Sequence, residues 1–321
     1  MKKNMPIDIS MLRGRTNPAA RIIAIGGGKG GIGKSFISSS LAICLSQLGF
    51  KTLAIDLDLG SANLHTWLGT PISPMGINEY ILNDSSTLND VIAPTQWKNL
   101  SLISGSSEAR DMANISQLQR SRLMSAIYKQ PSDFIILDLS AGTHHSTLDF
   151  FLMAQSKVVV FTPEPSSIEN AYRFLKYAFY RKLRRYEHQL NLKDQIDAIA
   201  NEKGSSALKS PADLIRALIK QEPNLGGKIN TLMSELNFKI VLNQARTRAD
   251  LELGHSLQSV CSRYFGFPCN YVGGLEYDNA VWQCLRQKQH LLLANRQSHL
   301  YAQLIAIARS LSAPQILKAV V

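Results

Sequence analysis

The sequence contains no long hydrophobic run and no sign of an export signal. No stretch reaches 18 consecutive apolar residues, so we expect no membrane-spanning helix. The first ten residues hold two lysines but no apolar segment of the kind that a secretory signal requires. We therefore expect a cytoplasmic chain, and a position at the periphery of the inner membrane or the nucleoid is left open.

Cysteine is also scarce, with four residues in a chain of 321. None of them belongs to a CxxC pair, and their spacings fit neither a zinc site nor a disulfide framework. We expect Cys44, Cys261, Cys269 and Cys284 to behave as small apolar side chains.

Acidic residues are outnumbered by basic ones. The chain has 24 Asp and Glu against 35 Lys and Arg, which gives a net charge of +11. This charge suits a nucleotide, a nucleic acid or an anionic membrane as partner. A basic solvated surface gives the same value, so the charge does not choose among them.

Short apolar runs alternate with helical patterns along most of the chain. The expected strands are 21–25, 51–56, 100–104, 134–138, 157–162 and 238–243, with a weaker one near 270–272. The expected helices are 35–48, 117–129, 168–186 and 296–311. This alternation predicts an α/β fold with a single doubly wound, mostly parallel sheet flanked by helices.

The domain limits follow from composition. We expect a flexible N-terminal tail at 1–20, a P-loop domain at 21–311 and a C-terminal tail at 312–321. A polar stretch at about 186–236, punctuated by glycines, predicts a partly helical insertion within that domain.

A glycine-rich loop lies between the first expected strand and the first helix. Residues 28–35 read GKGGIGKS and satisfy the phosphate-loop pattern G-x-x-x-x-G-K-[ST] in its required context. Backbone N–H groups and Lys34 would bind the phosphates of ATP, and Ser35 would offer its hydroxyl to Mg²⁺. The candidate loop residues are Gly28, Lys29, Gly30, Gly31, Ile32, Gly33, Lys34 and Ser35.

Carboxylates follow two other expected strands. Asp56 and Asp58 stand at positions i and i+2 after one strand, and Asp138 ends another in a Walker B pattern. In such folds ligands bind where the carboxyl ends of the strands meet. Asp138 would therefore support Mg²⁺.

The loop carries a second lysine, Lys29, and here the chain resembles the deviant Walker A signature K-G-G-x-G-K-[ST] of MinD/ParA-type ATPases. The resemblance covers about 21–185 and 238–311. It implies an ATP-dependent homodimer in which Lys29 reaches the partner's nucleotide, and an ATPase that is slow without a partner. It also implies that Asp58 positions water, that Asp56 lies near the metal and that Gly142 approaches the γ-phosphate. Asn63 matches a family position in the nucleotide site, and Asn243 the adenine-recognition position.

Two stretches look closest to the flagellar-number regulators, the FlhG/FleN branch of the MinD-like proteins. These stretches are 162–172 and 277–289. The branch has an N-terminal segment that stimulates a partner GTPase, but residues 8–13 lack its glutamine. The paired cysteines of iron–sulfur carriers are missing, and 20 residues leave no room for the helix-turn-helix of many plasmid partition proteins.

Residues 172–185 predict a basic helix with interleaved aromatic side chains. It could bind DNA phosphates or anionic lipid, or it could pack its aromatic side on the sheet. Its candidate contact residues are Arg173, Lys176, Arg181, Lys182, Arg184 and Arg185. Three functions stay open: a switch that positions a cellular structure such as the flagellum, a DNA-associated partition ATPase, and a nucleotide-binding scaffold without catalysis.

Overall fold

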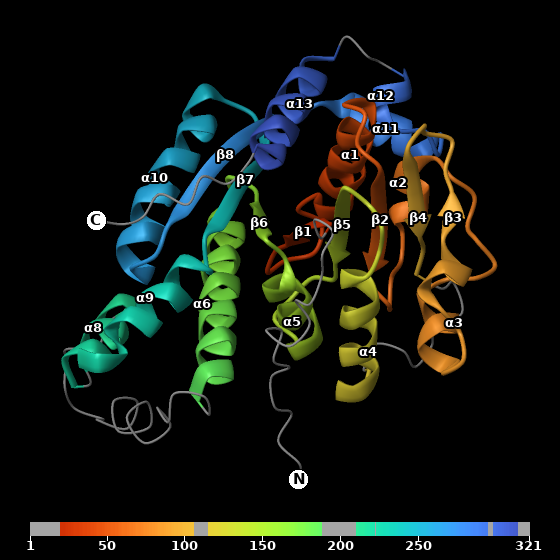
Figure 1. Ribbon diagram of the computed structural model, residues 1–321. Coiled ribbons are helices and arrows are strands. Elements are labelled where there is room, and N and C mark those ends of the chain that lie inside the picture. Colours follow the sequence, from red (N-terminus) through yellow and green to blue (C-terminus); the bar gives the residue numbers. More distant parts are fainter. Residues whose placement is uncertain (1–19, 106–114, 188–209, 222, 295–297, 314–321) are drawn as a thin grey trace.

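The computed structural model describes residues 20–105, 115–187, 210–221, 223–294 and 298–313 (Figure 1). Its centre is an eight-stranded sheet with the order β3-β4-β2-β5-β1-β6-β7-β8. The strands are β1 (Arg21–Gly26), β2 (Thr52–Leu57), β3 (Ala93–Pro94), β4 (Leu100–Ile103), β5 (Phe134–Leu139), β6 (Ser156–Phe161), β7 (Phe238–Ala245) and β8 (Cys269–Glu276). All pairs are parallel except β3 with β4.

Helices cover both faces of this sheet (Figure 1). One face packs against α1 (Lys34–Gln47), α2 (Leu64–Leu68), α11 (Asn279–Arg286), α12 (Leu291–Ala294) and α13 (His299–Ser312). The other packs against α3 (Ile77–Leu82), α4 (Gln117–Tyr128), α5 (His145–Met153), α6 (Pro165–Glu187), α8 (Pro211–Gln221), α9 (Gly226–Ser234) and α10 (Arg248–Phe265).

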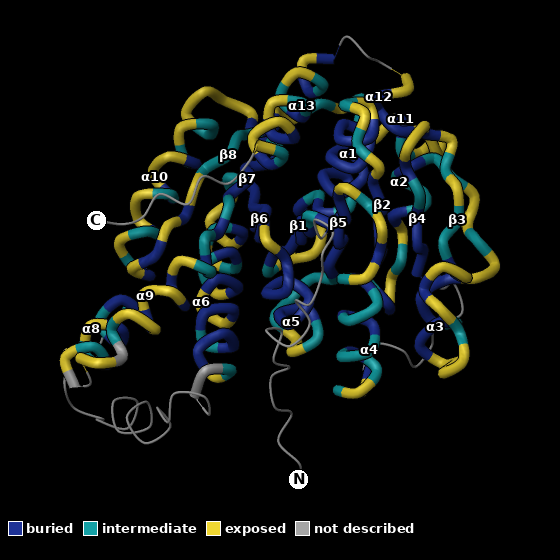
Figure 2. The backbone as a smooth tube through the Cα atoms, in the orientation of Figure 1, coloured by how far each residue is buried: buried dark blue, intermediate teal, exposed yellow. Residues whose placement is uncertain are grey.

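The two hydrophobic cores follow from the alternation of side chains along each strand. Ile22 and Ala24 of β1 belong to the core under α6, whereas Ile23 and Ile25 belong to the core under α1. Both sides are apolar because neither face of the central strands meets water, and Figure 2 shows these strands as buried.

The predicted α/β fold class is confirmed, and all seven expected strands are present. The short strand β3 and helices α2, α3, α5, α10, α11 and α12 were not predicted. Within the expected insertion, α8 and α9 bury Leu218, Ile229 and Leu232, so this region contributes to the core. Its segment 188–209 lies outside the described residues, as do 1–19 and 314–321, so the domain limits stay a prediction.

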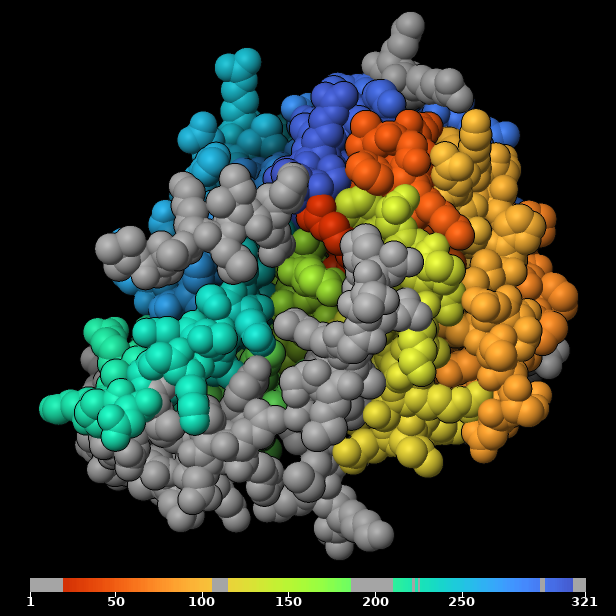
Figure 3. Space-filling model, viewed as in Figure 1, coloured from red at the N-terminus to blue at the C-terminus, as the bar shows by residue number. Residues whose placement is uncertain are grey.

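Helices α8 and α9 lie at the surface beside α6, below α10 in the space-filling view (Figure 3). Within the described parts of the chain, no helix combines the length and apolar character needed to cross a membrane.

Candidate functional site

The glycine loop joins the end of β1 to the start of α1. Gly33 is the residue before α1 and has φ +91°, a left-handed conformation that favours glycine. A Cβ atom at Gly28 would lie 2.3 Å from the carbonyl oxygen of Asn170, so the loop packs directly on α6. Gly30 and Gly31, by contrast, have open space around them. The loop is therefore supported on one side and accessible on the other.

Lys34 folds back over this loop. Its side chain is buried, and Nζ donates to the carbonyl oxygen of Lys29 at 3.3 Å. Burial lowers the pKa of Lys34, while the negative charges of Asp138 and Asp58 act in the opposite direction. The ammonium group thus lies close to two of the three carboxylates that the sequence proposes for the site, Asp58 and Asp138.

Asp138 ends β5 next to the start of α1. It is 1% exposed, and the hydroxyl of Ser38 donates to it at 2.8 Å. Burial raises the pKa of Asp138 to about 6, although hydrogen bonds from Ser35 and Ser38 favour the charged form. Sequence reasoning missed Ser38, and its spacing of three residues from Ser35 on one helix face was the available signal.

Asp56 is fully buried at the end of β2 and anchors the loop that follows. Its Oδ1 accepts the N–H of Asp58 at 3.0 Å, and Oδ2 accepts those of Asn63 and Leu64 at 2.9 Å. Burial, reinforced by the charge of Asp138, raises the pKa of Asp56 to about 8. Both oxygens are engaged with backbone, so the structure gives Asp56 a loop-holding role, and its proposed place near the metal stays a prediction.

The loop after β5 also reaches the glycine loop. The N–H of Gly142 lies 3.3 Å from the carbonyl oxygen of Gly27 and donates to it, and Gly142 has φ +94°. The strand ends and the glycine loop are thus brought together as the sequence predicted.

Lys29 is exposed and has intrachain contacts. Its Nζ lies 3.5 Å from a carboxylate oxygen of Glu164 and 3.2 Å from the hydroxyl of Ser166. An exposed pair of this kind contributes little to stability, so the side chain can exchange partners easily.

Asn243, at the end of β7, contacts the glycine loop from the other side. Its amide nitrogen donates to the carbonyl oxygen of Ile32 at 2.9 Å, and a Cβ at Gly33 would lie 2.1 Å from that nitrogen. This loop-supporting contact was not foreseen, and adenine recognition by Asn243 stays a prediction.

The structure corrects the prediction that all six basic residues of α6 form a surface patch. Arg181 and Arg185 pair with the buried Asp149, and Lys182 pairs with Glu235. These three side chains are largely buried and engaged in salt bridges, so they do not form part of an exposed basic patch. Only Arg173, Lys176 and Arg184 are exposed.

The arrangement fits a nucleotide and magnesium. Around the glycine loop, Ser35 in the first turn of α1 provides a hydroxyl, Asp138 near the end of β5 provides a carboxylate, and Gly30 and Gly31 leave space for phosphate oxygens. Among the described residues no group of three or more His, Cys, Asp and Glu side chains could hold a metal alone. Magnesium commonly shares its ligands with phosphates and water.

Comparison with known families decides the classification. A family described as an AAA domain matches residues 20–193, more than half of the chain. The chain belongs to this family. Its loop and strand-end motifs are those of the MinD/ParA-type members, as the sequence predicted.

Individual relatives agree with this assignment. The AAA-domain protein is 30% identical over 167 residues to a putative septum site-determining protein MinD of Oltmannsiellopsis viridis. The aligned segment covers 52% of this chain and 51% of the relative. It is 31% identical over 158 residues to the antiactivator FleN of Pseudomonas aeruginosa, which covers 49% of this chain and 55% of that protein. The chain thus spans about half the length of the curated relatives it matches.

The similarity in fold covers more of the chain than these sequence matches do. The structure of a septum site-determining MinD with Mg-ADP from Pyrococcus horikoshii superposes with a TM-score of 0.63 at 19% identity, over 94% of this chain and 100% of the other. At this identity the likeness establishes the fold alone.

Proposed function

We propose that this AAA-domain protein is an ATP-hydrolysing switch that dimerises when it binds ATP and positions or regulates a cellular structure. The observation that carries the proposal is the placement of Asp58. It is half-buried, its backbone is tied to Asp56, and its charge acts on Lys34 within the glycine loop. A carboxylate held beside a phosphate-binding lysine is suited to orient a water molecule for attack.

The chain's own residues divide the work. Lys34 and the loop N–H groups bind and orient the phosphates, and Asp58 accepts a hydrogen bond from the attacking water. Bound Mg²⁺, held by Ser35 and supported by Asp138, would neutralise charge that develops on the phosphates. Gly142 contacts the glycine loop, so a change at the γ-phosphate can reach the loop after β5.

The finer role that we propose is control of flagellar number or placement. It is supported by the likeness to FleN and by the two stretches at 162–172 and 277–289. MinD relatives are equally similar, so cell-division positioning is the natural competitor. Deletion of the gene followed by imaging of flagella and septa distinguishes these roles: normal flagella with misplaced septa would contradict the flagellar proposal.

The switch itself is tested with two variants. Lys34→Ala should abolish ATP binding, because the loop loses its phosphate-binding ammonium group. Asp58→Ala should still bind ATP but lose on the order of 10²-fold in turnover, and it should accumulate as a dimer. Phosphate release and light scattering in the presence of ATP measure both effects.

Ser61→Ala, an exposed change in the same loop, is the matched control and should keep wild-type turnover. Turnover of Asp58→Ala at the wild-type rate would exclude the assigned role. If the wild-type chain releases no phosphate, with or without DNA and lipid vesicles, the scaffold function replaces the switch.

A DNA-associated partition ATPase is the second candidate. The exposed Arg173, Lys176 and Arg184 on α6 and the net charge of +11 support it. Non-specific DNA binding that requires ATP would favour this function.

A further inference from the structure

The end of β7 departs from regular strand geometry where it passes the glycine loop. The register of β7 with β8 shifts between Leu242 and Ala245. Within this irregularity Gln244 has φ +61°, a left-handed conformation that a residue with a Cβ atom adopts at an energetic cost. Strained residues of this kind are concentrated at active and ligand-binding sites. The irregular end of β7 is therefore a candidate functional element.

The irregular segment brings Asn243 onto the glycine loop. Asn243 is 4% exposed, and its amide nitrogen donates to the carbonyl oxygen of Ile32 at 2.9 Å. Ile32 is itself buried, so its carbonyl needs a partner within the protein. A Cβ atom at Gly33 would lie 2.1 Å from the same amide nitrogen. The amide thus packs directly on the peptide unit that joins Ile32 to Gly33.

This contact fixes the direction of an N–H group in the loop. A trans peptide unit is planar, and its C=O and N–H groups point in opposite directions. Because Asn243 holds the carbonyl of Ile32, the N–H of Gly33 points away from Asn243. Gly33 belongs to the phosphate-loop pattern, in which backbone N–H groups converge on phosphate oxygens. The position of Asn243 thus controls the orientation of a phosphate donor.

We propose that Asn243 and Gln244 form a positioning element that sets the affinity of the glycine loop for phosphate, whatever base the nucleotide carries. The inference rests on the proposed ATP-binding function and deepens it. Gln244 turns the chain so that Asn243 reaches the loop, and Asn243 holds the loop in one conformation, so that less ordering is needed when phosphate binds. Adenine recognition, the role that the sequence suggests for Asn243, would act on the base instead.

A ligand without a base separates these two roles. Isothermal titration calorimetry of the full-length chain measures the affinities for ATP, GTP and inorganic tripolyphosphate, each with Mg²⁺. Asn243→Leu keeps a similar volume but leaves the buried carbonyl of Ile32 without this donor. Because an unsatisfied buried carbonyl is costly, all three ligands should bind about tenfold more weakly. A loss confined to ATP would show base recognition alone and would overturn the proposal.

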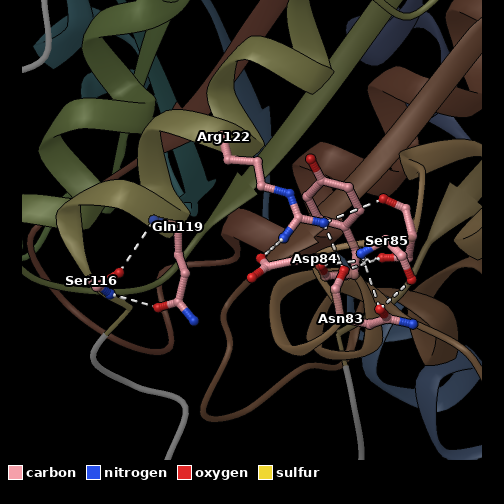
Figure 4. A network of polar contacts seen from close by, with 8 residues as sticks. Asn83, Asp84, Ser85, Ser116, Gln119 and Arg122 are labelled. Carbon is pink, nitrogen blue, oxygen red and sulfur yellow. Dashed lines mark hydrogen bonds and ion pairs between the residues drawn. The ribbon is translucent and has the colours of Figure 1, made fainter.

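Asn83→Leu is the matched control, because it makes the same replacement in an exposed loop outside the site. Figure 4 shows Asn83 with Asp84, Ser85 and Arg122; its Oδ1 accepts the N–H of Ser85 at 3.1 Å and the hydroxyl of Ser85 at 2.7 Å. This variant should bind all three ligands as the wild type does. An equal loss in Asn83→Leu and Asn243→Leu would indicate a general weakening of the fold and refute the local role.

A second set of variants changes the backbone preference and leaves the amide in place, which covers the case that Asn243→Leu does not fold. Isoleucine tolerates positive φ poorly, so Gln244→Ile should shift the end of β7 and weaken tripolyphosphate binding, whereas Gln244→Gly, which adopts this φ freely, should not. Asn99→Ile places the same strain at φ +64° before β4, at the opposite edge of the sheet, and should keep wild-type affinity. Wild-type tripolyphosphate affinity in Gln244→Ile would contradict the positioning role.

The outcome for the wild type distinguishes this inference from the function on which it rests. If the wild type binds ATP but neither Asn243→Leu nor Gln244→Ile weakens tripolyphosphate binding, only the positioning role fails. If the wild type binds none of the three ligands, the ATP-binding function fails as well.

Discussion

At the scale of single residues, burial decides what the polar side chains do. Asp56 and Asp138 are neighbours across β2 and β5, and both lie in the core at strand ends. Asp56 uses its oxygens to hold three backbone N–H groups, and this keeps Asp58 near Lys34. The sequence pattern D-x-D placed Asp56 and Asp58 together after one strand, but it did not show that Asp56 is the residue that holds the loop.

His290 shows the energetic cost of a buried ionisable group. It is completely buried, its Nε2 lies 3.2 Å from the hydroxyl of Ser40, and its Nδ1 accepts the N–H of Leu292. Burial lowers its pKa to about 3, so it stays neutral in the folded protein at any mild pH.

This burial predicts a pH dependence of stability. Between pH of about 6.5 and about 3 the unfolded chain binds a proton at His290 that the folded chain does not. His290 alone should therefore lower the free energy of unfolding by about 1.4 kcal/mol for each unit of pH decrease in that window, whereas Asp56 and Asp138, whose pKa values are raised by burial, act in the opposite direction. Urea denaturation of the full chain at pH 7, 6 and 5 measures the slope.

His290→Gln should make the free energy of unfolding fall less, or rise more, on acidification than in the wild type, by the His290 contribution, because Gln does not titrate and can still bond to Ser40. The exposed His144→Gln is the control and should keep the wild-type slope. An unchanged slope in His290→Gln would show that other groups cause the pH dependence.

At the scale of elements, α6 divides its basic residues between two tasks. Arg181 and Arg185 neutralise Asp149 inside the protein, whereas Arg173, Lys176 and Arg184 meet solvent. Aromatic residues Phe174 and Phe179 pack the helix on the sheet. Sequence periodicity predicted the helix, but an arginine's long stem allows either an inward or an outward position, so burial could not be read from the pattern.

If α6 binds DNA, its exposed cations should carry the binding. Replacing Arg173, Lys176 and Arg184 together with Gln should abolish the DNA shift, and the slope of log affinity against log salt should fall by about 0.9 for each lost phosphate contact. Stability should change little, because the pair that Arg173 forms with Glu169 lies on the exposed helix face. Fluorescence anisotropy at several salt concentrations measures both affinity and slope.

Arg185→Gln is the opposite control: it should leave the surface charges intact and keep the wild-type DNA affinity, because Arg185 pairs with the buried Asp149. DNA affinity that survives the triple replacement would place any DNA contact elsewhere.

At the scale of the whole molecule, the candidate site is open on the side where a second copy would bind in the proposed switch. Lys29 is 43% exposed, and within the described part of the chain its ammonium group contacts Glu164 and Ser166. An exposed pair contributes at most about 1 kcal/mol, so a partner's phosphates could compete for this lysine.

We therefore expect Lys29→Ala to bind ATP through Lys34 but to lose assembly. In an Asp58→Ala background, the added Lys29→Ala change should convert the ATP-bound dimer to monomer. Light scattering after size-exclusion chromatography measures the mass, and Lys98→Ala, an exposed lysine away from the loop, is the control. A dimer that persists without Lys29 would contradict the shared-site proposal.

The sequence by itself determined the α/β class, the strand positions and the glycine loop, because each depends on local spacing and on alternation of apolar residues. It missed α10 although this helix has a Thr247 capping box with Asp250, since its apolar positions Leu257, Cys261 and Phe265 are sparse and interspersed with polar ones.

Only the tertiary structure decided which distant side chains meet. It placed Asn243 on the glycine loop 211 positions earlier in the chain, and it gathered Arg120, Asp149 and Arg181 from three helices. Such contacts join residues with no local relation, and they depend on how the sheet orders its strands and on where helices cross it. For that reason burial and charge pairing, rather than motif, separated the buried arginines from the exposed ones.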